Sequence, residues 1–176
     1  MEGLDPNAFD AVVGGFRVLV GLIFAAHGWA KRFSGGGLAG TAGWFDSIGM
    51  KPGQLHAQLA SGVEIVAGVM LAIGLLTPFA AAGIIGVMVV AGWTVHRSNG
   101  FFIVSEGWEY TFVFGLMALL VAGLGPGRWS IDWALGIAAD LNGWLGLAIA
   151  LVLGIGGGIA QLAVFYRPPA PAEASS

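Results

Sequence analysis

The sequence predicts an all-α membrane protein, and three observations lead to this fold class. Of the 176 residues, 57% are hydrophobic and only 10% are charged, whereas a soluble domain carries about 25% charged residues. Several apolar runs reach the length of about 20 residues that a helix needs to cross a bilayer. The 31 glycines lie mainly within these runs, where small residues let membrane helices pack closely. We therefore expect five membrane helices packed as one bundle.

The composition also excludes several kinds of site. The chain contains no cysteine, which excludes disulfides, thiol redox chemistry, Cys-ligated iron–sulfur clusters and Cys-based zinc sites. It has no basic patch of the kind that binds nucleic acid. Its acidic N-terminus lacks the basic segment of a cleavable signal peptide, so we expect the first helix to remain in the protein.

A short polar segment precedes the first apolar run. Asp5-Pro6 is typical of a helix start, and the first helix is expected over residues 10–32. The glycine-rich segment 34–51 is too interrupted to span a membrane. Within it, residues 40–49 are expected to form a short interfacial helix with aromatic side chains at headgroup level.

The remaining apolar runs predict four further helices. The second and third are expected over residues 54–76 and 79–96, separated by a turn that contains proline. The fourth is expected over residues 107–124. An amphipathic segment, 128–140, then leads to the fifth helix, 142–166, which is again long enough to span.

With five spans, the loops after the first and third helices share one end of the bundle with the C-terminus, and we call this end the mouth. Five of the seven basic residues belong to the mouth: Lys31, Arg32, Lys51, Arg97 and Arg167. The other two, Arg17 and Arg128, belong to the opposite end. The positive-inside rule therefore predicts that the mouth is cytoplasmic.

The same topology gathers ionisable side chains at the mouth. His27 and Lys31 are four residues apart and share one face of the first helix. Glu64 lies within the second helix, at a depth similar to that of His27. Ionisable groups inside membrane segments usually face the bundle interior or a water-filled cavity. We therefore predict a ligand-binding pocket formed by His27, Lys31, Glu64 and Glu109, with His96 and Tyr110 at its rim.

Within this pocket, Glu64 and His27 are the candidate catalytic residues. Burial and the attraction of Lys31 act in opposite directions on the protonation of Glu64, which makes it a candidate proton carrier. The alternative is a salt bridge that locks the first two helices together and binds nothing. Capping of a helix C-terminus is an equally good explanation for His27 and Lys31. No metal is predicted, because the sequence lacks the HxxxH and ExxH spacings of common metal sites.

At the opposite end, Arg17 and Asp132 are expected to form a structural ion pair. Arg17 lies early in the first helix, and a turn at 125–127 can bring Asp132 back over that end of the bundle. If the pair is buried, removing one partner would cost about 3–5 kcal/mol.

Several short motifs of the chain form a recognisable series. In order, they are Arg17, His27-Gly28 with Lys31, Gly49-Met50-Lys51-Pro52, Glu64 with Gly68 and Leu71, Gly74-Leu75-Leu76-Thr77, Gly125-Pro126-Gly127 and Trp129-Ser130-Ile131-Asp132. The series resembles the DoxX family of small bacterial membrane proteins, which are relatives of the DoxD subunit of a thiosulfate:quinone oxidoreductase. The resemblance implies a four-helix membrane core, here residues 1–136, with redox or quinone-linked associations. Residues 137–166 add a C-terminal membrane helix to this core, and 167–176 are expected to be a disordered tail.

Two classes of function remain open. The first is a small subunit of a redox- or quinone-linked complex in the bacterial inner membrane. A quinone needs a hydrogen-bond donor for each carbonyl and a proton route, which His27, Lys31 and Glu64 can supply, while a partner would deliver the electrons. The second is a non-catalytic scaffold or accessory subunit of a larger complex, or a carrier of a small amphipathic or anionic compound. Both classes imply protein partners or a homo-oligomer within the bilayer, and neither decides whether the protein is an enzyme.

Overall fold

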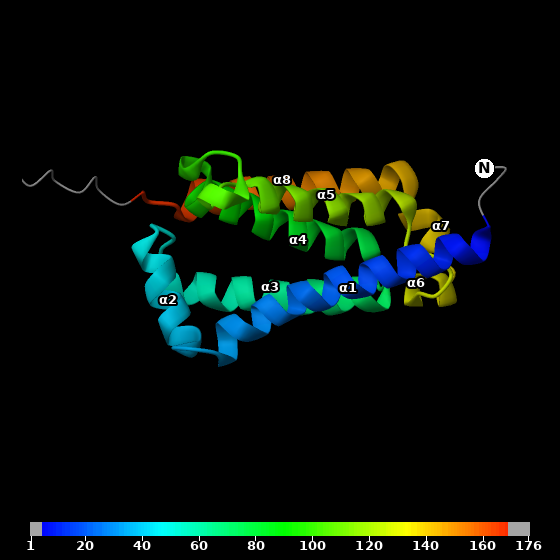
Figure 1. Cartoon of the computed structure of the whole chain (residues 1–176), viewed down its shortest axis with the longest axis horizontal. Helices are drawn as coiled ribbons and strands as arrows, with labels where there is room; N and C mark the ends of the chain where they lie inside the picture. The colour runs from blue at the N-terminus through cyan, green and yellow to red at the C-terminus, as the bar shows by residue number, and fades with distance from the viewer. Residues whose placement is uncertain (1–4, 169–176) are drawn as a thin grey trace, which may run out of the picture.

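The computed structural model describes residues 5–168, and this part of the chain is almost entirely helical. Five long helices run up and down along one axis (Figure 1): α1 (Pro6–Phe33), α3 (Gly53–Ile73), α4 (Thr77–Ala91), α5 (Glu109–Leu124) and α8 (Gly143–Phe165). Four of these are long and apolar enough to cross a membrane, if α4 is counted with the turns that continue it to Asn99; α5 is apolar but shorter. The predicted all-α membrane bundle is therefore confirmed.

The first helix begins at the predicted start signal. The Asp5 carboxylate accepts a hydrogen bond from the backbone N–H of Asn7 at 2.9 Å, and Pro6 occupies a first-turn position that needs no donor. Because of this cap, α1 starts four residues before the expected position 10. Lys31 and Arg32 lie in its last turn, where positive charge favours the helix dipole.

Short helices lie at the two ends of the bundle. The interfacial helix expected over 40–49 is α2 (Gly37–Ser47), which packs against α3 and α1 at the mouth (Figure 1). At the opposite end, the amphipathic segment forms two short helices, α6 (Ile131–Ala134) and α7 (Ala138–Leu141). Gly136 separates them, because its φ of +74° belongs to the left-handed region and ends the first of the two.

The third predicted helix is present but changes its winding near its end. Beyond Ala91 the chain continues as a π-helical turn, Gly92–His96, and then as a 3₁₀ turn, Arg97–Asn99. A π-turn places an extra residue within the helix and occurs frequently at functional sites.

Glycines permit a close helix contact between α1 and α3. A Cβ atom on Gly21 would lie 2.4 Å from the backbone oxygen of Gly68, and one on Gly68 would lie 2.5 Å from that of Gly21. Near the mouth, a Cβ on Gly28 would lie 2.6 Å from the backbone oxygen of Ser61. The two backbones therefore approach to a distance that only glycine allows.

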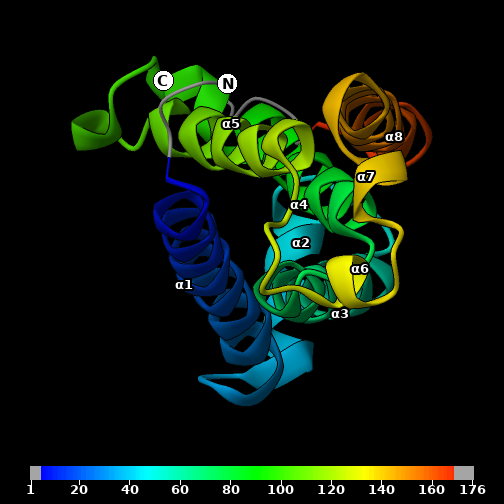
Figure 2. The same ribbon diagram turned by 90° about the vertical axis from the view of Figure 1, so that its right-hand side faces the viewer.

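The other helices assemble around α4. Figure 2, a view along the bundle, shows α1 and α3 on one side, α5 and α8 on the other, and α4 between them. The apolar core between these helices contains Phe24, Leu71, Ile84 and Val121, each at most 2% exposed. α8 packs along α4, where a Cβ on Gly154 would lie 2.7 Å from the Cβ of Ile85.

The segment after α8 pairs with the loop that precedes α3. The Arg167 N–H donates to the Gly49 carbonyl at 2.7 Å, and the Lys51 N–H donates to the Phe165 carbonyl at 3.3 Å. These bonds connect the end of α8 to the loop between α2 and α3 at the mouth. Apart from Arg167 and Pro168, the predicted disordered tail lies outside the described residues.

Candidate functional site

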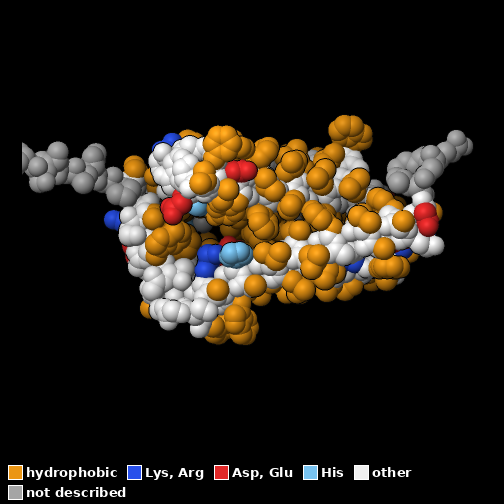
Figure 3. Space-filling view, in the orientation of Figure 1, with side chains coloured by type: hydrophobic (Ala, Val, Ile, Leu, Met, Phe, Trp, Pro, Cys, Tyr) orange, Lys and Arg blue, Asp and Glu red, His pale blue; other side chains and the backbone are white. Residues whose placement is uncertain are grey.

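A cavity of about 440 Å³ lies at the mouth, between α1 and α3 on one side and α4 and α5 on the other. Figure 3 shows a hollow at this end of the bundle, where basic, acidic and histidine side chains gather among hydrophobic ones. Its walls are mainly apolar, with a few polar groups, and its volume falls within the range of about 300–1,000 Å³ that is typical of ligand sites. The arrangement therefore suits a small, mostly apolar ligand with a few polar atoms.

One side of the cavity carries an ion pair. The Lys31 Nζ atom donates to both carboxylate oxygens of Glu64, at 2.8 and 2.7 Å. The Glu64 side chain is only 4% exposed, whereas that of Lys31 is 28% exposed. Gly28 makes this pairing possible, because a Cβ there would lie 2.8 Å from the Cβ of Glu64 and would push the helices apart. His27 lines the same cavity from the more exposed face of α1.

The other side of the cavity carries a hydrogen-bonded pair, His96 and Tyr110. The His96 Nδ1 atom lies 2.7 Å from the carbonyl oxygen of Glu106, and its Nε2 atom lies 3.0 Å from the Tyr110 hydroxyl. A carbonyl can only accept, so Nδ1 carries a hydrogen. In a neutral imidazole, Nε2 then accepts the hydrogen of the Tyr110 hydroxyl. The Tyr110 oxygen is left as an acceptor that faces the cavity.

Two polar residues of the mouth were not predicted. Gln161 lines the cavity from α8, and its Nε2 atom lies 3.0 Å from Nδ1 of His56, which is completely buried. The His56 ring contacts the rings of Phe45 and Phe165 at centroid distances of 6.0 and 5.0 Å. Gln161 itself could have indicated this contact, because a side-chain amide within an apolar membrane helix usually bonds to another helix.

Glu109 is absent from the cavity walls, so its predicted place in the pocket is wrong. Its carboxylate accepts a hydrogen bond from the backbone N–H of Ile103 at 2.8 Å. The reason is that α5 begins at Glu109, which turns this first residue towards the preceding connection. The other predicted pocket residues, His27, Lys31, Glu64, His96 and Tyr110, all line the cavity, and their part in binding or catalysis stays a prediction.

At the opposite end, the predicted ion pair between Arg17 and Asp132 does not form. The buried Arg17 guanidinium donates to four backbone carbonyls: those of Leu71 at 3.3 Å, Pro126 at 3.0 Å, Ala72 and Trp129. The Asp132 carboxylate instead accepts from the N–H of Leu76 at 2.6 Å, the N–H of Thr77 at 2.9 Å and the hydroxyl of Thr77 at 2.7 Å.

The turn between α3 and α4 explains this difference. The last carbonyls of a helix and the first N–H groups of the next lack partners within their helices. Arg17 donates to the last carbonyls of α3, and Asp132 accepts from the first N–H groups of α4. The positive charge thus lies at the negative end of one helix dipole, and the negative charge lies at the positive end of the other.

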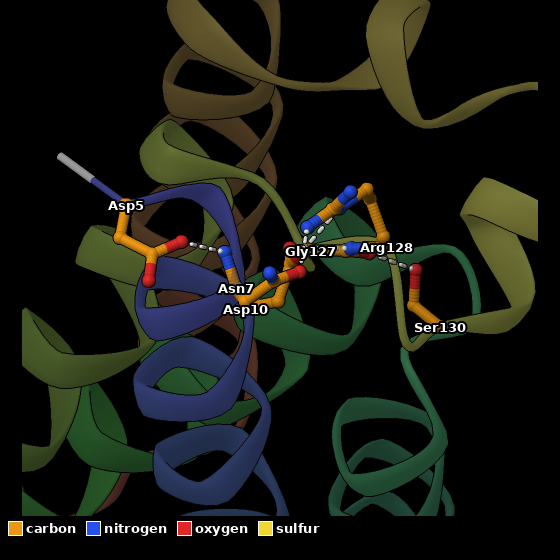
Figure 4. A network of polar contacts seen from close by, with 6 residues as sticks. All are labelled: Asp5, Asn7, Asp10, Gly127, Arg128 and Ser130. Atoms are coloured by element: carbon orange, nitrogen blue, oxygen red, sulfur yellow. Dashed lines mark hydrogen bonds and ion pairs between the residues drawn. The ribbon is translucent and has the colours of Figure 1, made fainter.

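An ion pair that was not predicted fastens the start of α1 at this end (Figure 4). The Asp10 carboxylate accepts from the Arg128 backbone N–H at 2.8 Å and also binds the Arg128 guanidinium. The guanidinium donates in addition to the side-chain oxygen of Asn7 at 2.8 Å. These contacts complete a structural polar network at the end opposite the cavity.

The Lys31–Glu64 pair allows a direct test of its structural role. Glu64→Gln is expected to lower the free energy of unfolding by about 1–3 kcal/mol, because it leaves Lys31 without a counter-charge. Breaking a fully buried pair costs about 3–5 kcal/mol, and the 28% exposure of Lys31 reduces this penalty. Unfolding in mixed detergent micelles should be measured for Lys31→Met, Glu64→Gln and the double variant. Strictly additive losses would show that the pair contributes nothing of its own.

The chain was also compared with known proteins. A family model described as DoxX matches residues 13–97, which include Arg17, Lys31, Glu64 and His96. An uncharacterized membrane protein of Mycobacterium tuberculosis is 34% identical over 128 residues, and the alignment covers 66% of this chain and 76% of that protein. An uncharacterized protein of Haemophilus influenzae is 23% identical over 94 residues, covering 53% of this chain and 62% of that protein. No solved structure matches the chain with comparable significance.

Proposed function

The chain belongs to the DoxX family of membrane proteins, and from this premise we propose that it is a subunit of a redox-linked membrane complex whose cavity binds the head group of a quinone. The observation that carries the proposal is the placement of two polar pairs on opposite sides of one apolar cavity. These pairs are Lys31 with Glu64 and His96 with Tyr110. A quinone head has the matching form, an apolar ring with an oxygen at each of two opposite positions.

The hydrogen-bonding capacity of the cavity supports this ligand class. The Lys31 ammonium has three N–H groups, of which two bind Glu64, so one remains for a ligand carbonyl. The Tyr110 oxygen remains as an acceptor for a ligand hydroxyl. Because Glu64 balances the charge of Lys31, the pair favours a neutral ring over an anion.

The same residues supply a proton route. A bound quinone would contribute two-electron, two-proton redox chemistry. In this proposal, Glu64 holds a proton at the cavity wall. Tyr110 and His96 form a hydrogen-bonded chain from the cavity to the exposed loop that contains Glu106. The proposal includes a partner subunit, because the sequence contains no cofactor motif that would deliver the electrons.

The proposal predicts saturable binding of a short-chain quinone. Decylubiquinone should quench the tryptophan fluorescence of the purified protein in detergent, since Trp44 lines the cavity. Tyr110→Phe removes the acceptor for a ligand hydroxyl but keeps the ring, so it should weaken binding of the reduced form, decylubiquinol, roughly five- to tenfold, equivalent to about 1–1.5 kcal/mol. Ala91→Phe places a ring in the cavity and should abolish saturable binding.

Glu109→Gln serves as the control, because it changes a carboxylate at the same end of the bundle but outside the cavity. It should bind decylubiquinone as the wild-type protein does. Equal binding by the wild type and Ala91→Phe would contradict the proposal. A stable partner protein that co-purifies with a chain unable to bind quinone would instead support a scaffold function.

A further inference from the structure

A second groove lies on the other side of α4, and we propose that it binds one anionic glycerophospholipid. This groove, of about 400 Å³, runs between α4, α5 and α8. Its far end is lined by Ile85, Leu119 and Leu151, and its mouth end by Trp93, Arg97 and Trp108. We refer to it as the α4–α5–α8 groove. In the proposed complex, an acyl chain occupies the apolar part and the lipid phosphate meets Arg97.

The groove has the dimensions of one leaflet. Positions 85 to 97 of its α4 wall correspond to roughly 18 Å along the helix axis, at 1.5 Å per residue. One leaflet contributes about 15 Å to a hydrocarbon core of about 30 Å. Gly115 keeps the groove open, because a Cβ at this position would meet nothing within 4 Å. An extended acyl chain therefore has both the length and the width that it needs.

The groove also faces the surrounding bilayer. Phe112 and Leu116 on α5 and Ile155 on α8 line it, and these side chains are 53%, 43% and 39% exposed. A lipid tail can thus enter from the side, without displacing any of the packed helices.

Arg97 gives the groove its preference for an anion. Its guanidinium lies 4.1 Å above the ring of Trp93, and its side chain is exposed. Among residues 5–168, no carboxylate forms an ion pair with it. Trp93 and Trp108 mark the depth at which aromatic side chains meet lipid headgroups. A guanidinium at that depth, stacked on an aromatic ring with its N–H edge free, is suited to a phosphate.

The test is native mass spectrometry of the purified protein with phosphatidylglycerol and phosphatidylcholine in equal amounts. The wild-type chain should retain one phosphatidylglycerol in clear preference to phosphatidylcholine. Arg97→Gln should reduce retention of phosphatidylglycerol at least tenfold and remove the preference. Gly115→Leu should abolish retention of both lipids, because its side chain extends into the groove from a position where a Cβ meets nothing within 4 Å.

Two matched controls separate this site from a general surface effect. Lys51→Gln removes another exposed cation of the mouth, and Gly15→Leu adds the same side chain to an exposed glycine on α1. Both variants should retain phosphatidylglycerol as the wild type does. The proposal is overturned if the wild type retains no lipid, if Arg97→Gln keeps the preference, or if Lys51→Gln loses as much lipid as Arg97→Gln.

Discussion

Replacing Arg17 with methionine is expected to lower the free energy of unfolding by about 4 kcal/mol or more. Arg17 is 2% exposed, and its guanidinium is the donor for four backbone carbonyls. Each buried acceptor left without a donor costs about 1–3 kcal/mol, and these carbonyls lie at the end of a membrane bundle where methionine offers no hydrogen bond. Arg17→Lys should recover only part of the loss, because an ammonium has three donors and a shorter reach.

The measurement is unfolding in mixed detergent micelles, followed by circular dichroism. Arg167→Met is the control, since Arg167 is exposed and, among residues 5–168, its guanidinium bonds to carbonyls of its own helix end, those of Tyr166 and Val164. This control should change stability by less than about 0.5 kcal/mol. A loss for Arg17→Met no larger than that of the control would refute the structural role of Arg17.

The second large effect is expected at the contact between α1 and α3. Gly21→Ala should destabilise the bundle by about 3 kcal/mol or more, at the upper end of the range for overpacking. The added Cβ would lie 2.4 Å from the backbone oxygen of Gly68 and 2.7 Å from the backbone nitrogen of Ala72. Because both neighbours are backbone atoms, the helices must separate to accept the methyl group.

Gly15→Ala provides the matched control on the same helix. A Cβ there meets nothing within 4 Å, so the variant should be neutral or should gain up to about 1 kcal/mol from helix propensity. The thermal unfolding midpoints of Gly21→Ala and Gly15→Ala should be compared in the same detergent. Equal midpoints would show that the close α1–α3 approach does not limit stability.

Most of the fold could be predicted because membrane helices are encoded in long apolar runs. The run at 142–166, for example, corresponds to α8, Gly143–Phe165. The shared position of Lys31 and Glu64 followed from similar reasoning, because a four-residue spacing and an up–down topology fix which groups meet at one end. These signals are local, or depend only on the number of helices.

The polar network at the opposite end could not be predicted in the same way. Arg17 bonds to carbonyls, and carbonyls have no sequence signature. Two of its four acceptors, the carbonyls of Leu71 and Ala72, lack partners within α3 because that helix ends at Ile73. That ending depends on Gly74 and Leu76, whose φ angles of +67° and +44° reverse the chain. Asp10 and Arg128 are 118 positions apart, so only the folded bundle brings them together. Opposite charge and the turn at 125–127 suggested a pair between Arg17 and Asp132. Instead, each of the two side chains binds unpaired backbone groups at a helix end.

The bonds between the last segment and the loop before α3 have a consequence for biosynthesis. Chains are made from the N-terminus, so α1 and α3 can associate, and Lys31 can meet Glu64, while later helices are still being synthesised. Glu64 can thus enter the bilayer already neutralised by its partner. The cavity wall at Gln161 and the bonds from Phe165 and Arg167 to the loop come last. Arrival of α8 is therefore the step that closes the mouth.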